Sequence, residues 1–506
     1  LTLLNYALKF GYSYDRWQTI INALLEKDPG SPKIHRLRVI HLYEWDFNLL
    51  LGVKWKQLLH RMCDNNTINP SIYGGVPGHT TFDPVFIREM AYKLTRLIRQ
   101  PLVHFDNDAK SCYDRIPCFL ANVASRKYGM NAKVCVVQGK TLRQAKYYLK
   151  TKFGLSDEYV SHTQGAPWFG TGQGSGNSPM YWLVISNTLF DIFQEKATGG
   201  ATYQSPDKSM TMKLFQLMFI DDAMNITNTS WEVQDPCESL ESLVAQASAD
   251  SHLWRDLLEA SNQALELTKW KYHVMHYDFA DSGAPVFSVD DEPPFPLEVN
   301  ASHGNPVSVI HVPNSQAIKY LRFLKCIGNQ TQQKAALQKK ADDYARVANC
   351  SPLSRRGANI FYRGIYKLSV DYVLPLTYFS EKELGEVQKK AHTAFVTKCG
   401  YCRKTPLKVI YGPSQWGGTE FFHLYDLQGY GQVASFLKYW RNPSSQSSSM
   451  LRIVMSWVQY CAGTSFSVVG DTSAKLPHLE SMWITSMRDY LATIDATIEL
   501  QDTYIP

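Results

Sequence analysis

The sequence predicts an α+β fold with an antiparallel sheet in its first two thirds and helices in its last third. Two observations lead to this class. Apolar strand-like runs bend back on themselves around Leu214 to Ile226, which is typical of a β-hairpin. Apolar residues recur at helical spacing over 332–347, 355–373 and 381–396. At 506 residues and 44% hydrophobic composition, the chain is large enough for two or three connected domains.

Two adjacent carboxylates, Asp221 and Asp222, stand at the bend of this hairpin. The run Leu214 to Ile220 precedes them, and the apolar pattern resumes from Ala223 to Ile226. Neighbouring carboxylates at the edge of a core repel each other and resist loss of water, so a cation is needed to neutralise them. Carboxylate oxygens are hard ligands, and the pair therefore predicts a divalent metal, best matched by Mg²⁺.

A third carboxylate, Asp108, ends an earlier strand-like run that begins at Val103. Asp106 falls on the same strand face by period-two alternation, and we interpret it as a supporting structural acid. A glycine-rich loop at 172–176 then opens the apolar helix-like stretch 180–193. The order along the chain is strand acid, glycine loop with helix, and double-acid hairpin.

This order resembles the reverse transcriptase (RNA-directed DNA polymerase) domain of the non-LTR retrotransposon (LINE-like) type, from about residue 15 to about 425. The resemblance is carried by five motifs in the family's order: Asp108 with Tyr113 and Asp114, Gly172 to Gly174 with Ser178-Pro179, Phe219 to Asp222, Leu265 to Lys271, and Ile318 to Leu321. Two positions depart from the family pattern. Gly172 stands where Pro is common, and Arg322 replaces a Gly that often follows Tyr-Leu.

The resemblance implies a right-hand polymerase with an antiparallel-sheet palm, fingers and a helical thumb. On this basis residues 1–100 are fingers interleaved with palm, and 101–325 are palm with an inserted fingers segment. Residues 326–412 are the helical thumb, and 413–506 are a helical C-terminal extension that we expect to pack on it.

The implied activity is template-directed DNA synthesis on RNA by two-metal nucleotidyl transfer, with two Mg²⁺ ions or Mn²⁺ in their place. The predicted catalytic and metal-binding residues are Asp108, Asp221 and Asp222, with the Ala109 carbonyl as a further ligand. The predicted nucleotide-binding residues are Lys33, Arg36, Arg38, Tyr113, Gln173 and Lys271. The predicted template and primer contacts are Gly172, Gly174, Tyr320 and Leu321. In this family the aromatic ring at the Tyr113 position lies under the nucleotide sugar and excludes a 2′ hydroxyl.

Each motif has an ordinary interpretation when taken alone. The fingers cations also fit a solvated strand face, the glycine loop also fits a plain turn, and Lys271 also fits an exposed structural lysine. The sequence Gly75 to Thr81 resembles the template-side loop of the family and is equally typical of a turn. The five motifs together, in order, favour the polymerase.

Positive charge is concentrated after the palm motifs. The chain carries 52 Lys and Arg against 46 Asp and Glu, and residues 325–410 alone hold 16 basic and 6 acidic side chains. This segment is the predicted thumb, where duplex phosphates would bind with a strong dependence on salt. A helical surface that is basic without binding nucleic acid remains the alternative.

Ten cysteines form no pattern of a secreted protein, and no run is long enough to cross a membrane. We therefore expect reduced thiols and an intracellular protein of the nucleus or cytoplasm. Cys399 and Cys402 are the only metal-like pair, with His392 nearby and no second pair, which disfavours structural zinc.

The expected partners are an RNA template, a DNA primer and deoxynucleoside triphosphates, with no membrane. Because Leu1 enters the fingers almost at once, we expect a longer polyprotein in which endonuclease or RNase H modules accompany this domain. Two alternatives stay open: an RNA-dependent RNA polymerase, and a catalytically inactive nucleic-acid-binding scaffold derived from a polymerase.

Overall fold

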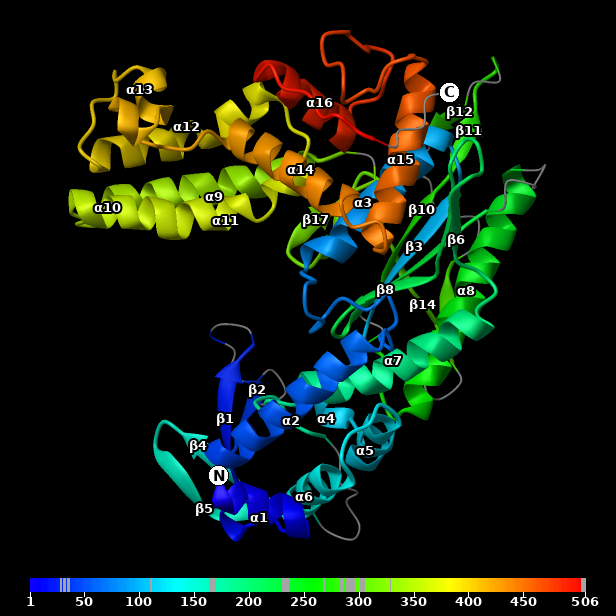
Figure 1. Cartoon of the computed structure of the whole chain (residues 1–506), viewed down its shortest axis with the longest axis vertical. Coiled ribbons are helices and arrows are strands. Elements are labelled where there is room, and N and C mark those ends of the chain that lie inside the picture. The colour runs from blue at the N-terminus through cyan, green and yellow to red at the C-terminus, as the bar shows by residue number, and fades with distance from the viewer. Residues whose placement is uncertain are drawn as a thin grey trace.

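The computed structural model of the chain has an α+β fold (Figure 1). It describes residues 1–27, 30, 33, 37–109, 112–162, 170–229, 236–266, 269–282, 285–287, 296–300, 305–327 and 329–501. In the described ranges no helix combines the length and hydropathy that a membrane-spanning helix needs.

A five-stranded central sheet has the order β15-β10-β3-β9-β8. All neighbouring strands are antiparallel except β10 and β15, which are parallel. The antiparallel sheet expected from the sequence is therefore present in this part of the chain. Its strands are β3 (Leu102–Asp108), β8 (Gln216–Phe219), β9 (Asp222–Asn228), β10 (Lys271–Met275) and β15 (Ile310–His311).

Strand β3 lies in the middle of this sheet and is buried on both faces. Val103 and Phe105 pack with helix α8 (Pro236–Ala260), whereas Leu102 joins the core around helix α3 (Phe82–Ile98). Successive side chains of a strand point to opposite faces, so one short apolar run serves both helices. Figure 1 shows α8 running along the outer side of the sheet.

The predicted hairpin is present, with one difference at its start. Leu214 belongs to β7 (Thr211–Leu214), which pairs with β6 (Ala201–Gln204) in a separate two-stranded sheet. The chain leaves that sheet at Phe215 and enters β8. The single apolar run 214–220 is thus divided between two sheets, because Leu214 pairs with β6 whereas 216–219 pair with β9.

A second, mixed sheet is formed near the N-terminus, in the order β2-β1-β4-β5. Its strands are β1 (Thr19–Glu26), β2 (Leu37–Leu42), β4 (Lys146–Thr151) and β5 (Gly154–Ser161). Strands β1 and β4 are parallel although about 120 residues separate them. This pairing brings the segment after Asp114 back beside the N-terminal strands.

The helices around this second sheet share one apolar core with the first part of the central sheet. They are α1 (Thr2–Phe10), α2 (Trp45–Asp64), α4 (Cys112–Arg115), α5 (Cys118–Lys127), α6 (Ala132–Arg143) and α7 (Ser178–Lys196). Helix α7 is the apolar helix predicted after the glycine loop. It is buried along most of its length, and Phe190 and Phe193 contact Trp254 of α8 edge to face.

Three helical segments follow the central sheet, as the sequence predicts for 326–412. They comprise α9 (Thr331–Cys350), a broken segment of α10 (Arg355–Phe361), a π-helical turn (Tyr362–Lys367) and α11 (Leu368–Asp371), and α12 (Glu381–Lys398), followed by the short α13 (Leu407–Tyr411). Ser380 begins α12 with a capping box to Glu383. Figure 1 shows these helices projecting together away from the central sheet.

The last helices are α14 (Leu424–Trp440), α15 (Gln446–Ala462) and α16 (Trp483–Thr493). Their packing differs from the expected position on the thumb segment alone. Helix α14 contacts α12, but α15 packs along α3 beneath the central sheet. Asp83 of α3 accepts hydrogen bonds from Lys438 at 2.9 Å and Tyr439 at 2.7 Å. The C-terminal residues therefore complete the core behind the sheet.

Three further strand pairs form separate two-stranded sheets: β11 (Tyr277–Phe279) with β12 (Pro285–Phe287), β13 (Glu298–Asn300) with β14 (Pro306–Ser308), and β16 (Ile318–Tyr320) with β17 (Phe323–Lys325). The acidic, proline-rich composition of Asp281 to Pro296 predicts an exposed loop. Strand β12 falls inside it, and its other residues mostly lie outside the described ranges. The prediction is therefore wrong for 285–287.

Candidate active site

The three acids predicted from the sequence meet at one end of the central sheet. Asp108 is the last residue of β3 and Asp222 the first of β9, and the two are paired directly across the strands. Directly opposed residues point to the same face with their Cβ atoms about 5 Å apart. Asp221 lies in the two-residue turn that joins β8 to β9.

The turn carrying Asp221 is held in an unfavourable conformation. Ile220 has φ of 61°, which is rare for a β-branched residue. A methyl group on Gly74 would lie 2.2 Å from the Ile220 nitrogen, so only glycine fits behind the turn. Trp182 donates a hydrogen bond from Nε1 to the Ile220 carbonyl at 2.6 Å. Tertiary contacts from two other segments thus fix the position of Asp221.

These carboxylates are poorly compensated. Burial, followed by the charges of Asp221, Asp108 and Asp106, raises the pKa of Asp222 to about 7. Burial and then Asp108 also raise the pKa of Asp221. Lys269 opposes both shifts. A folded protein that keeps such a group in place bears an energetic cost, which is common where carboxylates serve a ligand.

Lys269 forms an ion pair with Asp108 and was missed by the sequence analysis. Lys271, which was chosen instead, is the first residue of β10 and lies opposite Asp106 in the register. Both lysines line a pocket of about 330 Å³ together with Asp108 and Asp222. The sequence offered two lysines around Trp270, and only the path of the chain decides which one reaches Asp108.

Asp106 points into a buried polar cluster. Its carboxylate accepts a hydrogen bond from the guanidinium of Arg88 in α3 at 3.1 Å and lies 3.3 Å from Nε2 of His104. Burial would raise the pKa of Asp106, but Arg88 and then His104 outweigh it and lower that pKa to about 2. Asp106 is therefore a charged anchor between β3 and α3, in line with the structural role expected for it.

Two predicted nucleotide-binding residues lie within electrostatic reach of Asp221. Arg38 of β2 lowers the pKa of Asp221, and Asp221 in turn contributes to the raised pKa of Tyr113, whose largest cause is burial. Lys33 is exposed, and no contact ties it to the acids. Arg36 lies outside the described residues.

The glycine loop lies against strand β2. Gln173 pairs with Ile40 in a parallel bridge, and its carbonyl accepts a hydrogen bond from the His41 nitrogen at 2.6 Å. A methyl group on Gly172 would lie 2.2 Å from Nδ1 of His41, and one on Gly174 would lie 2.2 Å from its carbonyl oxygen. Gly172 has φ of 66°, which proline cannot adopt.

Tyr320 and Leu321 belong to the β16–β17 hairpin. Tyr320 is buried, with Arg88 over its ring at 5.2 Å, whereas Leu321 accepts a hydrogen bond from the Tyr372 hydroxyl at 3.0 Å. Leu321 and Arg322 both have positive φ, as a two-residue turn of this kind requires. This is the position where the family often has glycine. Leu321 and Arg322 line a second depression with Asp222.

The carboxylate oxygens of Asp108, Asp221 and Asp222 are of the chemical type that binds divalent cations such as Mg²⁺. Ala109 and Leu265 form an isolated antiparallel bridge. In this bridge the Glu266 nitrogen donates a hydrogen bond to the backbone carbonyl of Asp108 at 3.2 Å. Among the described residues, however, no three His, Cys, Asp or Glu side chains are gathered closely enough to hold a metal. Asp108 is turned to Lys269 instead. Cys399, Cys402 and His392, all among the described residues, likewise do not form a group that could hold a metal.

No protein-family model matches the sequence, and a search of curated proteins finds no match. Solved structures with some likeness include telomerase from Candida tropicalis in complex with the TWJ fragment of telomeric RNA, at 12% identity, covering 90% of this chain and 67% of that one, with a TM-score of 0.35. Telomerase from Candida albicans in the same kind of complex has 13% identity over 87% and 64% of the two chains, with the same TM-score. Scores this low carry no weight for fold or function.

Proposed function

We propose that the protein is a reverse transcriptase of the non-LTR retrotransposon type, which copies RNA into DNA by two-metal nucleotidyl transfer. The observation that carries the proposal is the pairing of Asp108 with Asp222 across the two inner strands of the sheet, with Asp221 in the adjoining turn. Three carboxylates from two distant segments that meet at one end of the sheet, at the expense of a raised pKa of Asp222, are hard to explain by stability alone.

In this proposal the central sheet is the palm, the N-terminal sheet belongs to the fingers, and α9 to α12 form the thumb. Asp108, Asp221 and Asp222 would hold two Mg²⁺ or Mn²⁺ ions, with the Ala109 carbonyl as a further ligand. When bound, such ions activate the primer hydroxyl and neutralise charge on the transferred phosphate and the leaving pyrophosphate.

The lysine that serves the leaving group is Lys269 rather than Lys271. Its ammonium already lies at the Asp108 carboxylate, and that contact raises its pKa despite partial burial. A cation held by Asp108 would compete with Lys269 for the same carboxylate oxygens. Lys269 would then be available to supply positive charge and a proton to the leaving pyrophosphate.

Tyr113 limits the sugar of the incoming nucleotide. Its side chain is mostly buried and lies near Asp221, at the start of the segment that follows β3. The ring presents bulk rather than charge, since burial raises the pKa of its hydroxyl and keeps it neutral. Arg38 of β2 lies within electrostatic reach of Asp221 and would bind the triphosphate.

The test is extension of a DNA primer on an RNA template with Mg²⁺. We expect the wild-type chain to incorporate deoxynucleotides and Asp221→Asn to lose this activity. Tyr113→Val should accept more ribonucleotides while it keeps much of its deoxynucleotide activity. Efficient extension with ribonucleotides by the wild type would identify an RNA-dependent RNA polymerase. RNA binding without any extension would identify an inactive scaffold.

A further inference from the structure

The N-terminal sheet, β2-β1-β4-β5, has one face that is turned away from the apolar cores. Ile20 and Tyr147, paired across β1 and β4, point to the core shared with the surrounding helices. Successive side chains of a strand point to opposite faces, so the next residues, Ile21 and Tyr148, point away from that core. We call the side that carries Ile21 and Tyr148 the open face. The sheet lies at the edge of the molecule (Figure 1).

The strand register defines which residues belong to the open face. Tyr148 is paired with Tyr159 of β5 and with Ile21 of β1, and Ile21 is paired with Leu42 of β2. Alternation along the strands adds Thr19, Ala23, Leu25, Arg38, Ile40, Lys146, Lys150 and Leu155. In the part of the chain that the structure describes, none of the apolar members packs against a hydrophobic core. Tyr159 is 47% exposed and Leu42 44%.

Aromatic rings and cations lie together on this face. The ring centroids of Tyr148 and Tyr159 are 5.6 Å apart, and Nζ of Lys146 lies 5.2 Å from the centroid of the Tyr159 ring. Lys150 follows on the same face of β4 and is exposed. Single-stranded nucleic acid is bound by stacking rings next to positive charge, and one hairpin, β4–β5, presents both on one surface.

The charge of the open face is positive. Its charged members are Arg38, Lys146 and Lys150, and none of the residues that the register places on it is acidic. The acids of β5, Asp157 and Glu158, lie in the bulge where the register between β4 and β5 shifts. A partner that complements this face therefore offers negative charge together with flat apolar groups. The phosphates and unpaired bases of a single strand offer both.

The open face continues to the candidate active site. The charge of Arg38 in β2 opposes the rise that burial causes in the pKa of Asp221. Lys27, directly after β1, has the same effect on the raised pKa of Asp114, whose largest cause is burial. From Arg38 to Leu42 strand β2 extends over about 13 Å. A single strand bound along the open face therefore has one end at the acids.

We propose that the open face binds single-stranded RNA, with bases stacked on Tyr148 and Tyr159 and phosphates held by Lys146 and Lys150. A lysine over an exposed ring makes a weaker contact than a stacked base does, so Lys146 can exchange the Tyr159 ring for a phosphate. The identity of the strand, the unpaired template ahead of the acids, rests on the proposed function. The stacking surface itself does not depend on catalysis.

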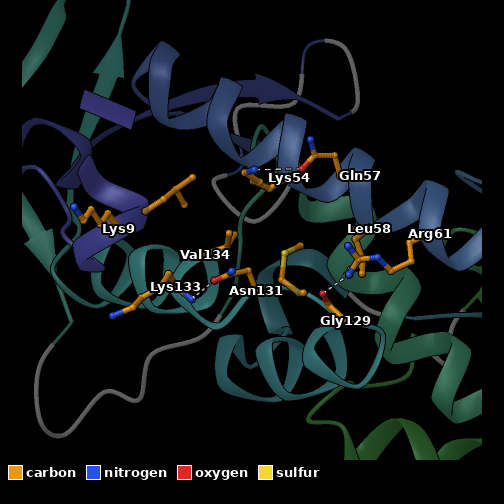
Figure 2. A pocket seen from close by; sticks show the side chains of 11 residues that line it. Lys9, Lys54, Gln57, Leu58, Arg61, Gly129, Asn131, Lys133 and Val134 are labelled. Atoms are coloured by element: carbon orange, nitrogen blue, oxygen red, sulfur yellow. Dashed lines mark hydrogen bonds between the residues drawn. The ribbon is translucent and has the colours of Figure 1, made fainter. Parts of the chain in front are cut away.

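A second basic surface of the N-terminal region has no stacking ring. Figure 2 shows a pocket of about 620 Å³ between α1, α2 and α6, with Lys9, Lys54, Arg61 and Lys133 in its wall. None of the described residues that line it is aromatic. The pocket offers charge without stacking, and it is the competing location for RNA in this region.

The first test measures binding of a single-stranded RNA oligonucleotide to the full chain by fluorescence anisotropy. Tyr159→Leu keeps an apolar side chain but removes the ring, and it should weaken binding about fivefold or more. Tyr159→Phe keeps the ring and should bind as the wild type does. Tyr460→Leu is the matched control, since Tyr460 of α15 is also exposed and contacts another aromatic ring. An equal loss in the control, or no loss in Tyr159→Leu, overturns the proposal.

Lys146→Gln combined with Lys150→Gln tests the phosphate contacts. A single strand releases about 0.7 counterions per phosphate, so loss of two contacts lowers the slope of log affinity against log salt by about 1.4. From about 50 to 200 mM salt, the variant should lose about sevenfold less affinity than the wild type loses. Lys196→Gln with Lys475→Gln removes the same charge from exposed positions elsewhere and should leave the slope unchanged. An unchanged slope in the open-face variant overturns the proposal.

Lysine acetylation compares the two basic surfaces without depending on catalysis. RNA should protect Lys146 and Lys150 more than Lys54 and Lys133 of the pocket, also in the Asp221→Asn chain. Protection of the pocket lysines alone would overturn the proposal. Protection of the open face without primer extension by the wild type would overturn only the proposed function, and extension without such protection would overturn only this inference.

Discussion

The raised pKa of Asp222 predicts that this residue destabilises the metal-free protein. A shift from 3.8 to about 7 corresponds to about 4 kcal/mol, because each pH unit is worth about 1.4 kcal/mol. The folded chain holds a proton that the unfolded chain has lost, so stability falls as pH rises from about 4 to about 7. Asp222→Asn, which has the same shape and no charge, should therefore stabilise the sheet.

The size of the effect depends on pH. At pH 5 the wild type has incurred only about 1.5 kcal/mol of this cost, and above pH 7 it has incurred all of it. The advantage of Asp222→Asn should thus grow by about 3 kcal/mol between pH 5 and pH 8. Hydrogen exchange of the peptides covering 102–108 and 222–228, measured in EDTA, reports the local opening free energy of these strands.

Two results would refute this reasoning. One is faster exchange in Asp222→Asn than in the wild type at pH 8. The other is the same advantage at both pH values, which would mean that the substitution acts through packing. Addition of Mg²⁺ should slow exchange in the wild type more than in the variant, because a bound cation removes the repulsion that the variant already lacks.

The remaining predictions concern the supports of the site. Arg88→Met should destabilise the chain by about 3 to 5 kcal/mol, since it removes the guanidinium that pairs with the mostly buried Asp106 carboxylate. The thermal midpoint of the variant should fall below that of the wild type by less at pH 5 than at pH 8, because Asp106 without Arg88 takes up a proton at the lower pH. A second substitution, Asp106→Asn, should recover part of the lost stability. Gly174→Ala should lower the thermal midpoint far more than Gly154→Ala, because the two glycines have similar positive φ (124° and 132°) but only Gly174 lies against another segment. Equal losses would argue against the close approach to β2. Arg322→Gly should raise the free energy of unfolding, measured by denaturant titration, by about 1 kcal/mol through relief of its left-handed φ. No gain would mean that the turn is unstrained.

Much of the secondary structure was predictable because it depends on local pattern. The apolar spacing of 180–193 and 381–396 foretold α7 and α12, and the acids at 221–222 marked the turn between β8 and β9. The division of the run 214–220 at Phe215 was not predictable, since both halves have strand character and their partners are distant in sequence.

The three acids could be singled out from the sequence, whereas the cations that contact them could not. Asp108, Asp221 and Asp222 are recognisable because carboxylates interrupt apolar strands, whereas Lys269 and Arg88 look like any other basic residue of their segments. The gathering of Lys9, Lys54, Arg61 and Lys133 around one pocket was also not predictable, because these residues belong to three helices far apart in the sequence.

The sequence by itself determined which residues alternate, which bend and which carry charge, since these properties follow from side-chain chemistry and local spacing. Tertiary structure alone decided that Asp108 faces Asp222, that Lys269 rather than Lys271 reaches them, and that Lys9, Lys54 and Lys133 surround one pocket. The physical reason is that electrostatic interaction depends on distance in space, and strand pairing brings together charges that the chain keeps a hundred residues apart.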